Sequence, residues 1–134
     1  MTTRKNNTPT EYNEACTFVD WLELQKQAGR VIDYCHIANE SYGRTRADLL
    51  RGQKMRRQGR KRGVFDYEVF VLSGSADLKY QYVRELRIEL KRRKGGHISA
   101  EQKYWLDVYT QANIPAAICK GADEAIAFVE KYLT

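Results

Sequence analysis

The chain has 134 residues, of which 43% are hydrophobic and 30% are charged, and its formal net charge is +6. This length predicts one domain with a single core. No stretch of about 18 apolar residues and no charged-then-apolar leader is present, so we expect a soluble, cytoplasmic protein with no membrane partner. Its three cysteines form no C-x-x-C pair and its histidines number two, which argues against a disulfide framework and a structural zinc site.

The positive charge is concentrated in residues 44–62. Nine basic residues and one acid, Asp48, give this stretch +8 and leave −2 for the rest of the chain. Nucleic acid is the usual partner of such a concentrated charge. The alternative is a solvated basic loop with no partner. Three glycines, Gly52, Gly59 and Gly63, predict a loop with several bends, in which residues 47–50 form a short helix.

Residues 1–9 are polar and lack periodicity, so we expect a flexible tail before a domain that spans residues 10–134. Apolar residues at helical spacing predict a helix from Glu11 to about Ala28, which Gly29 ends. Glu14 lies at the edge of the apolar face of this helix, as Glu11 does. The helix dipole alone also favours acids in the first turn.

Further along, β-prone residues predict strands over 31–37, 67–72, 87–91 and 115–119. Residues 76–84 either extend the third strand or form a hairpin loop. Ser99 and Gln102 have the spacing of a capping box that opens a helix to about Ala112, and residues 122–133 carry the apolar stripe of a closing helix. This order of elements predicts an α/β fold, a single domain with a mixed central sheet flanked by helices.

The strand predicted over residues 87–91 carries two charged side chains on one face. Alternation turns Ile88 and Leu90 toward the core and Glu89 and Lys91 toward the other face, roughly 7 Å apart along the strand. A carboxylate can hold a hard divalent cation, and an ammonium group can orient a water or neutralise developing negative charge. The alternative is a half-exposed strand with alternating charges.

Four short motifs then extend this pattern: Gly63-Val64-Phe65-Asp66, Ile88-Glu89-Leu90-Lys91, Gly95-Gly96 and Ser99-x-x-Gln102. With them the chain resembles the virus-type replication-repair nuclease domain, VRR-NUC, of the PD-(D/E)xK superfamily. The resemblance also takes in residues 36–40 and 119–126, so it covers nearly the whole chain. The family usually has proline where this chain has Phe65, but proline supplies stiffness rather than a ligand, so function need not be lost.

The resemblance implies a restriction-endonuclease-like core whose catalytic centre is Asp66, Glu89 and Lys91. It implies Mg²⁺ or Mn²⁺ as cofactor, held by the two carboxylates and the carbonyl of Leu90. An acid of the first helix is expected to assist, with Glu14 preferred over Glu11. The resemblance places Gln102 at the edge of the active site, whereas the sequence pattern assigns it equally well to the capping box.

The predicted function is that of a metal-dependent DNA endonuclease in a bacterial or phage-infected cell. The resemblance further implies a homodimer that prefers branched, Holliday-junction-like DNA. The residues expected to bind nucleic acid are basic, and they are Arg56, Arg57, Arg60, Lys61, Arg62, Arg92, Arg93 and Lys94. Two alternatives stay open, a nucleic-acid-binding module that does not cut and a nuclease that acts on RNA.

Other polar and aromatic residues have structural explanations. His36 in a predicted strand is expected to be a structural histidine rather than a catalytic base. Three aromatic residues at helical spacing, Tyr104, Trp105 and Tyr109, favour core packing over stacking on bases for most of them.

Overall fold

A computed structural model describes residues 7–38, 43–74 and 81–133 of the chain. Its centre is a four-stranded sheet in the order β1-β2-β3-β4. The strands are β1 (Val31–His36), β2 (Tyr67–Ser73), β3 (Tyr82–Lys91) and β4 (Ala116–Lys120). The first three are antiparallel neighbours, and β4 runs parallel to β3. The sheet is therefore mixed, as predicted.

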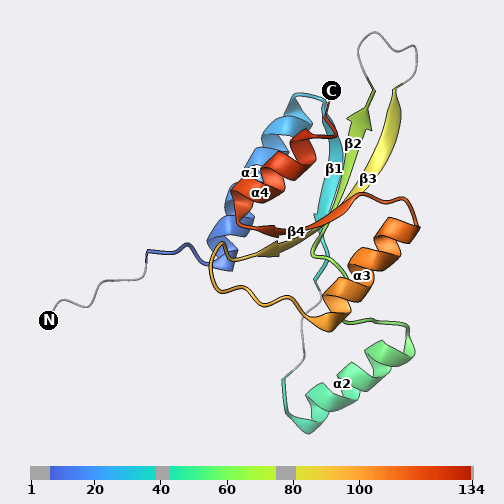
Figure 1. The fold of residues 1–134 in the computed structure, drawn as a ribbon. Helices are drawn as coiled ribbons and strands as arrows, with labels where there is room; N and C mark the ends of the chain where they lie inside the picture. Colours follow the sequence, from blue (N-terminus) through green and yellow to red (C-terminus); the bar gives the residue numbers. More distant parts are fainter. Residues whose placement is uncertain (1–6, 39–42, 75–80, 134) are drawn as a thin grey trace, which may run out of the picture.

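Helices cover both faces of this sheet. The helices α1 (Glu11–Gln27) and α4 (Ala122–Glu130) lie side by side on one face (Figure 1). Parallel strands need a crossover connection, and α3 (Ala100–Gln111) provides it between β3 and β4. Its Tyr109 ring lies 5.7 Å from the guanidinium of Arg87, which projects from the opposite face of the sheet. The expected sandwich of helices around one sheet is confirmed.

The core lies between the sheet and the α1–α4 layer. Leu86, Ile88 and Leu90 of β3 are buried there, as the alternation predicted. They pack with residues of α1, α4 and β2, namely Phe18, Leu22, Ala125, Val129, Val69 and Val71. Truncating one such leucine to alanine typically costs about 2–5 kcal/mol, so this layer fixes the position of β3.

The helix α2 (Arg46–Arg57) stands apart from these layers, below α3 in the view of Figure 1. The short helix predicted over residues 47–50 is present but longer than expected, and the bend predicted at Gly52 is wrong, because Gly52 lies inside the helix. A capping box between Thr45 and Asp48 opens the helix, and its remaining residues are mostly strong helix formers. Together they outweigh the penalty of about 1 kcal/mol for one interior glycine. Gly59 and Gly63 do make bends, with φ of +100° and +84°.

Several boundaries differ from those predicted. The closing helix ends at Glu130 rather than at Leu133, and β3 begins at Tyr82, so the end of the undecided segment extends the strand. Residues 75–80, like 1–6, lie outside the described ranges. Within those ranges, no helix has the length and apolar character needed to cross a membrane.

Candidate active site

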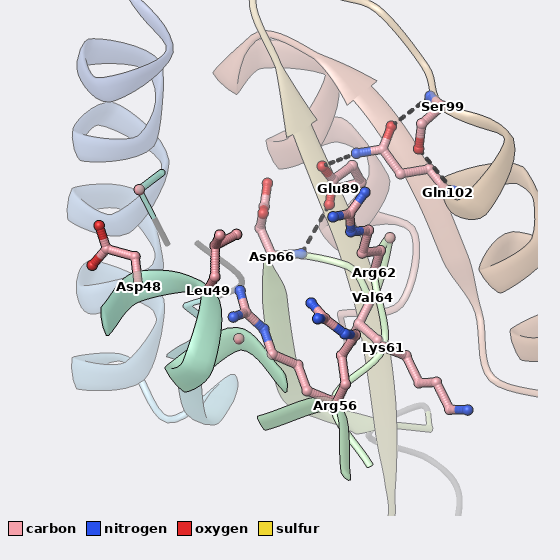
Figure 2. Close-up of a pocket in the computed structure, with 14 residues that line it drawn as sticks. Asp48, Leu49, Arg56, Lys61, Arg62, Val64, Asp66, Glu89, Ser99 and Gln102 are labelled. Carbon is pink, nitrogen blue, oxygen red and sulfur yellow. Dashed lines mark hydrogen bonds between the residues drawn. The ribbon is translucent and has the colours of Figure 1, made fainter. Parts of the chain in front are cut away.

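Two carboxylates meet where β2 begins and β3 ends. Tyr67 pairs with Ile88 in the antiparallel register, so Asp66, just before β2, lies beside Glu89. The backbone N–H of Asp66 donates to Glu89 Oε2 (3.0 Å), and the N–H of Leu90 donates to Asp66 Oδ2 (3.2 Å). Each carboxylate thus accepts a backbone N–H from the segment that carries the other, and Figure 2 shows the bond from Asp66 to Glu89.

The surroundings of this pair disfavour two negative charges. Glu89 is only 5% exposed. Burial raises its pKa to about 8, the charge of Asp66 adds to the rise, and Lys91 opposes it. Burial also raises the pKa of Asp66; the charge of Glu11 adds to this, while the Leu90 N–H opposes it. A cation at this position would relieve the repulsion, and such perturbed pairs are typical of functional sites.

Lys91 and Gln102 both contact Glu89 Oε1. Lys91 Nζ lies 3.5 Å from this oxygen, and Gln102 Nε2 donates to it at 2.6 Å. Gln102 also closes the predicted capping box, because its Oε1 accepts from the N–H of Ser99 and its own N–H donates to Ser99 Oγ. The two roles considered for Gln102 are therefore geometrically compatible, since one side chain caps α3 and contacts Glu89.

Glu14 lies in a different environment from the carboxylate pair. It is 2% exposed, and its Oε1 accepts from Arg93 Nε at 2.9 Å. Its Oε2 accepts from the N–H of Ala122, the first residue of α4. A Cβ at Gly121 would lie 2.7 Å from this oxygen, so the contact requires glycine there. Both oxygens of Glu14 are thus engaged in joining α1 to α4 and to the segment after β3.

Glu11 is the first-helix acid whose charge reaches the carboxylate pair. It is exposed, and its negative charge raises the pKa of Asp66. His36, at the end of β1, has the opposite effect on Asp66 and packs its ring 5.1 Å from that of Tyr67. The catalytic part predicted for Glu14 stays a prediction, and Glu11 stays the alternative acid of the first helix.

A cavity of about 910 Å³ adjoins the two carboxylates. Asp66, Glu89, Ser99 and Gln102 line one end of it (Figure 2). The rest of the lining comes from α2 and the segments that flank it, namely Gly43, Asp48, Leu49, Gly52, Arg56, Arg60, Lys61, Arg62, Gly63 and Val64. The structure thus places basic side chains and an acidic end within one cavity.

Four of the eight basic residues expected to bind nucleic acid line this cavity: Arg56, Arg60, Lys61 and Arg62. Arg57 is exposed on α2 but is not part of the lining, and Lys94 is exposed after β3. Arg93 is engaged by Glu14. Arg92 is half-buried, and its Nε has no hydrogen-bond partner among the described residues.

The residues just before Asp66 are held in place by packing against α3. Phe65, where the resembled family has proline, is fully buried against Tyr109 at 5.0 Å between ring centroids, and its N–H donates to the Tyr109 hydroxyl. A Cβ at Gly63 would lie 2.5 Å from the backbone of Glu101, in the first turn of α3. The packing of Phe65 on Tyr109 therefore supplies the stiffness that proline would give. The close approach of residue 63 to the backbone of Glu101 leaves room only for glycine.

The prediction that most aromatic residues of α3 pack inside the protein holds for two of the three. Tyr109 is buried and Trp105 is half-buried, donating from Nε1 to the carbonyl of Arg62 at 3.0 Å. Tyr104 is 63% exposed, so core packing does not hold for it. The Trp105 bond ties the end of the basic segment to α3, a contact that no local sequence signal indicated.

The donor atoms at the carboxylate pair suit a hard divalent cation. Mg²⁺ takes oxygen ligands, is bound by one or two carboxylates and retains several waters. Asp66 and Glu89 supply such carboxylates at the wall of an accessible cavity. Two carboxylates, with water at the remaining positions, are ligands of the kind that Mg²⁺ takes. Across the described parts of the chain, His, Cys, Asp and Glu form no group of three or more that could hold a metal.

One solved structure, described as "VRR_NUC domain protein", shares this fold with a TM-score of 0.69. The similarity covers 92% of this chain and 88% of that chain at 22% sequence identity. It supports the resemblance seen in the motifs and establishes the fold, a small α/β domain with a four-stranded mixed sheet. No family model matches the sequence, and no curated protein matches it.

Proposed function

We propose that the protein is a metal-dependent nuclease that hydrolyses phosphodiester bonds in DNA. The observation that carries this proposal is the Asp66–Glu89 pair, in which each carboxylate accepts a backbone N–H of the other strand beside a cavity with basic walls. The fold shared with a VRR_NUC domain protein supports the same class of activity.

The residues have separable tasks in this proposal. Asp66 and Glu89 would hold Mg²⁺ or Mn²⁺, with the Leu90 carbonyl as a further ligand, and the ion would supply charge neutralisation and an acidified water. Lys91, 3.5 Å from Glu89, places a positive charge where the phosphate gains negative charge. Gln102 holds Glu89 Oε1 in place from α3.

The basic walls provide the affinity for substrate. Arg56, Arg60, Lys61 and Arg62 line the cavity next to the acidic end, so a strand that contacts them passes the carboxylates. Contacts to phosphates position a nucleic acid without reading its sequence. The proposed nuclease is therefore directed by DNA structure rather than by base sequence, and branched DNA is its preferred substrate.

The direct test incubates the purified protein with Mg²⁺, Mn²⁺ or EDTA on linear duplex, four-way junction, single-stranded DNA and RNA of matched length. Metal-dependent cleavage of DNA that Asp66→Asn abolishes is the expected result. Cleavage of RNA alone would redirect the proposal to an RNA nuclease. Binding without cleavage under every condition would identify a binding module and overturn the proposal.

A homodimer is the second part of the proposal, since paired cuts in a junction need two sites at a fixed separation. Tyr82 and Val83 at the start of β3 are 52% and 57% exposed, which gives an apolar surface for a second copy. Light scattering at micromolar concentration is expected to give twice the 15.6 kDa chain mass. A strictly monomeric mass would contradict this part alone.

A further inference from the structure

The helix α2 contributes nothing to the core of the protein. None of its residues is buried, and Figure 1 shows it outside the sheet and the other helices. Its acid, Asp48, is used locally, because it accepts from the N–H of Thr45 and lies 3.5 Å from Arg51 Nη2. Stability of the fold therefore does not explain why this helix presents its side chains toward the cavity.

Two adjacent leucines of α2 differ in position but not in exposure. Leu49 is 58% exposed and Leu50 is 49% exposed. Leu49 lines the cavity, whereas Leu50 is not among its lining residues. Figure 2 shows Leu49 projecting from α2 into the cavity, on the side toward Asp66. Contact with an apolar part of a ligand would remove the Leu49 side chain from water, which is favourable.

The cavity thus carries three kinds of lining. Asp66 and Glu89 form its acidic end, arginine and lysine side chains its basic wall, and Leu49 and Val64 each add an apolar side chain. A nucleic-acid strand has matching chemistry, since its phosphates meet the basic wall while its bases are apolar on their flat faces. In an intact duplex those faces are stacked, and only base edges are accessible in the grooves. A base can therefore pack against Leu49 only when it is unstacked.

We infer that Leu49 is a specificity-determining residue that packs against an unpaired base next to the scissile phosphate, so that cleavage favours DNA with unpaired nucleotides at the cut. The inference rests on the proposed nuclease function and names the local DNA structure that it selects. Apolar side chains that insert at base steps and unstack them are an established means of binding deformed DNA. Here the side chain is carried by α2, and the carboxylates lie across the same cavity.

The test compares Leu49→Ala with Leu50→Ala, a matched control that removes the same atoms from the next residue of the same exposed helix. The substrates are duplexes of one sequence that are either fully paired or mismatched over three adjacent positions. Single-turnover cleavage with Mg²⁺ is expected to be faster on the mismatched duplex, by roughly tenfold, the order expected from burying one leucine. Leu49→Ala loses this preference and Leu50→Ala keeps it, while both variants retain the circular dichroism of the wild type.

A second readout does not depend on cleavage. The Asp66→Asn protein is titrated into mismatched DNA that carries 2-aminopurine, whose fluorescence rises when the base leaves its stack. The rise is expected with Asp66→Asn and absent when Leu49→Ala is added to it, whereas added Leu50→Ala leaves it unchanged.

The inference is overturned if both leucine variants behave alike in either assay, or if paired and mismatched duplexes are cut at equal rates. Failure to cut any DNA would instead overturn the nuclease proposal. In that case the fluorescence readout still decides whether Leu49 meets an unpaired base.

Discussion

Arg93, two residues beyond β3, donates from Nη2 to Oε1 of Glu14 in α1 at 2.7 Å. Glu14 is buried while the Arg93 side chain is 44% exposed, so the pair lies at the edge of the core. Close by, the N–H of Gly121 donates to the carbonyl of Lys91 at 2.8 Å. These contacts join α1 and α4 to the end of the strand that carries Glu89 and Lys91.

Arg93→Ala is expected to destabilise the protein by about 2 kcal/mol. Removing one partner of a fully buried ion pair costs about 3–5 kcal/mol, and water reaches Arg93, which reduces the penalty. Lys94→Ala, a neighbouring exposed cation, is the control and is expected to change stability by less than about 0.5 kcal/mol. Urea denaturation measures both. Unchanged stability with weaker DNA binding in Arg93→Ala would support the nucleic-acid binding that the sequence predicts for this residue.

Asp66→Asn or Glu89→Gln is expected to abolish cleavage and to preserve DNA binding without metal. Each change removes a metal ligand and almost no volume, so the contacts between the basic residues and DNA are retained. Lys91→Ala is expected to lower the cleavage rate on the order of 10². Glu68→Gln is the control, because Glu68 lies in β2, two residues after Asp66, and pairs with Arg87. Full activity in Asp66→Asn, Glu89→Gln or Lys91→Ala would refute the site.

The metal-free protein is expected to lose stability as the pH rises from about 4.5 to about 8. Burial raises the folded-state pKa of Glu89 to about 8 from an ordinary value of 4.5, so the folded state binds a proton that the unfolded state has released. Stability then falls with pH across this window. Thermal melting without metal measures the fall, and Glu89→Gln is expected to flatten it.

Magnesium is expected to show the opposite trend. Because the ion displaces the proton held by the carboxylate pair, its affinity increases as the pH rises toward 8. The increase in melting temperature on adding Mg²⁺ should therefore be larger at pH 8.5 than at pH 6. An increase that does not depend on pH would show that the ion binds elsewhere.

Replacing the cavity-lining cations Arg56, Arg60, Lys61 and Arg62 with glutamine is expected to flatten the salt dependence of DNA binding. The slope falls by roughly 0.9 for each phosphate of duplex DNA that the variant no longer neutralises. Arg57→Gln is the matched control, since Arg57 is exposed on the same helix and does not line the cavity. An unchanged slope in the fourfold variant would mean that the basic wall faces solvent only.

Local patterns in the sequence are sufficient to predict much of the sheet and the position of Gln102 at the start of α3. Alternation along residues 86–90 identified the buried face of β3, and the Ser99–Gln102 spacing identified the start of α3. The meeting of Asp66 with Glu89 followed from two adjacent antiparallel strands, which the motif resemblance anticipated. Periodicity and capping patterns depend on residues close together in the sequence. The buried face of β3 and the start of α3 are set by such neighbours, so they could be predicted.

Contacts between distant parts of the chain were beyond such patterns. Glu14 and Ala122 are 108 positions apart, and nothing near Glu14 in the sequence indicates that it accepts the first N–H of α4. The length of α2 is not evident from local patterns, because Gly52 indicates a bend although the helix formers around it outweigh its cost. The position of Leu49 in the cavity depends on how α2 is carried by its flanking segments, which is a tertiary property.

The absence of buried side chains in α2 also determines how the molecule opens locally. Unfolding this helix exposes little additional apolar surface, so its amides are expected to exchange with solvent through openings of low free energy. Amides of β2 and β3, next to the core, need an opening close to global unfolding. Substitutions in α2 can therefore accumulate with little effect on the stability of the sheet, so this helix can diverge while the carboxylate pair stays in place.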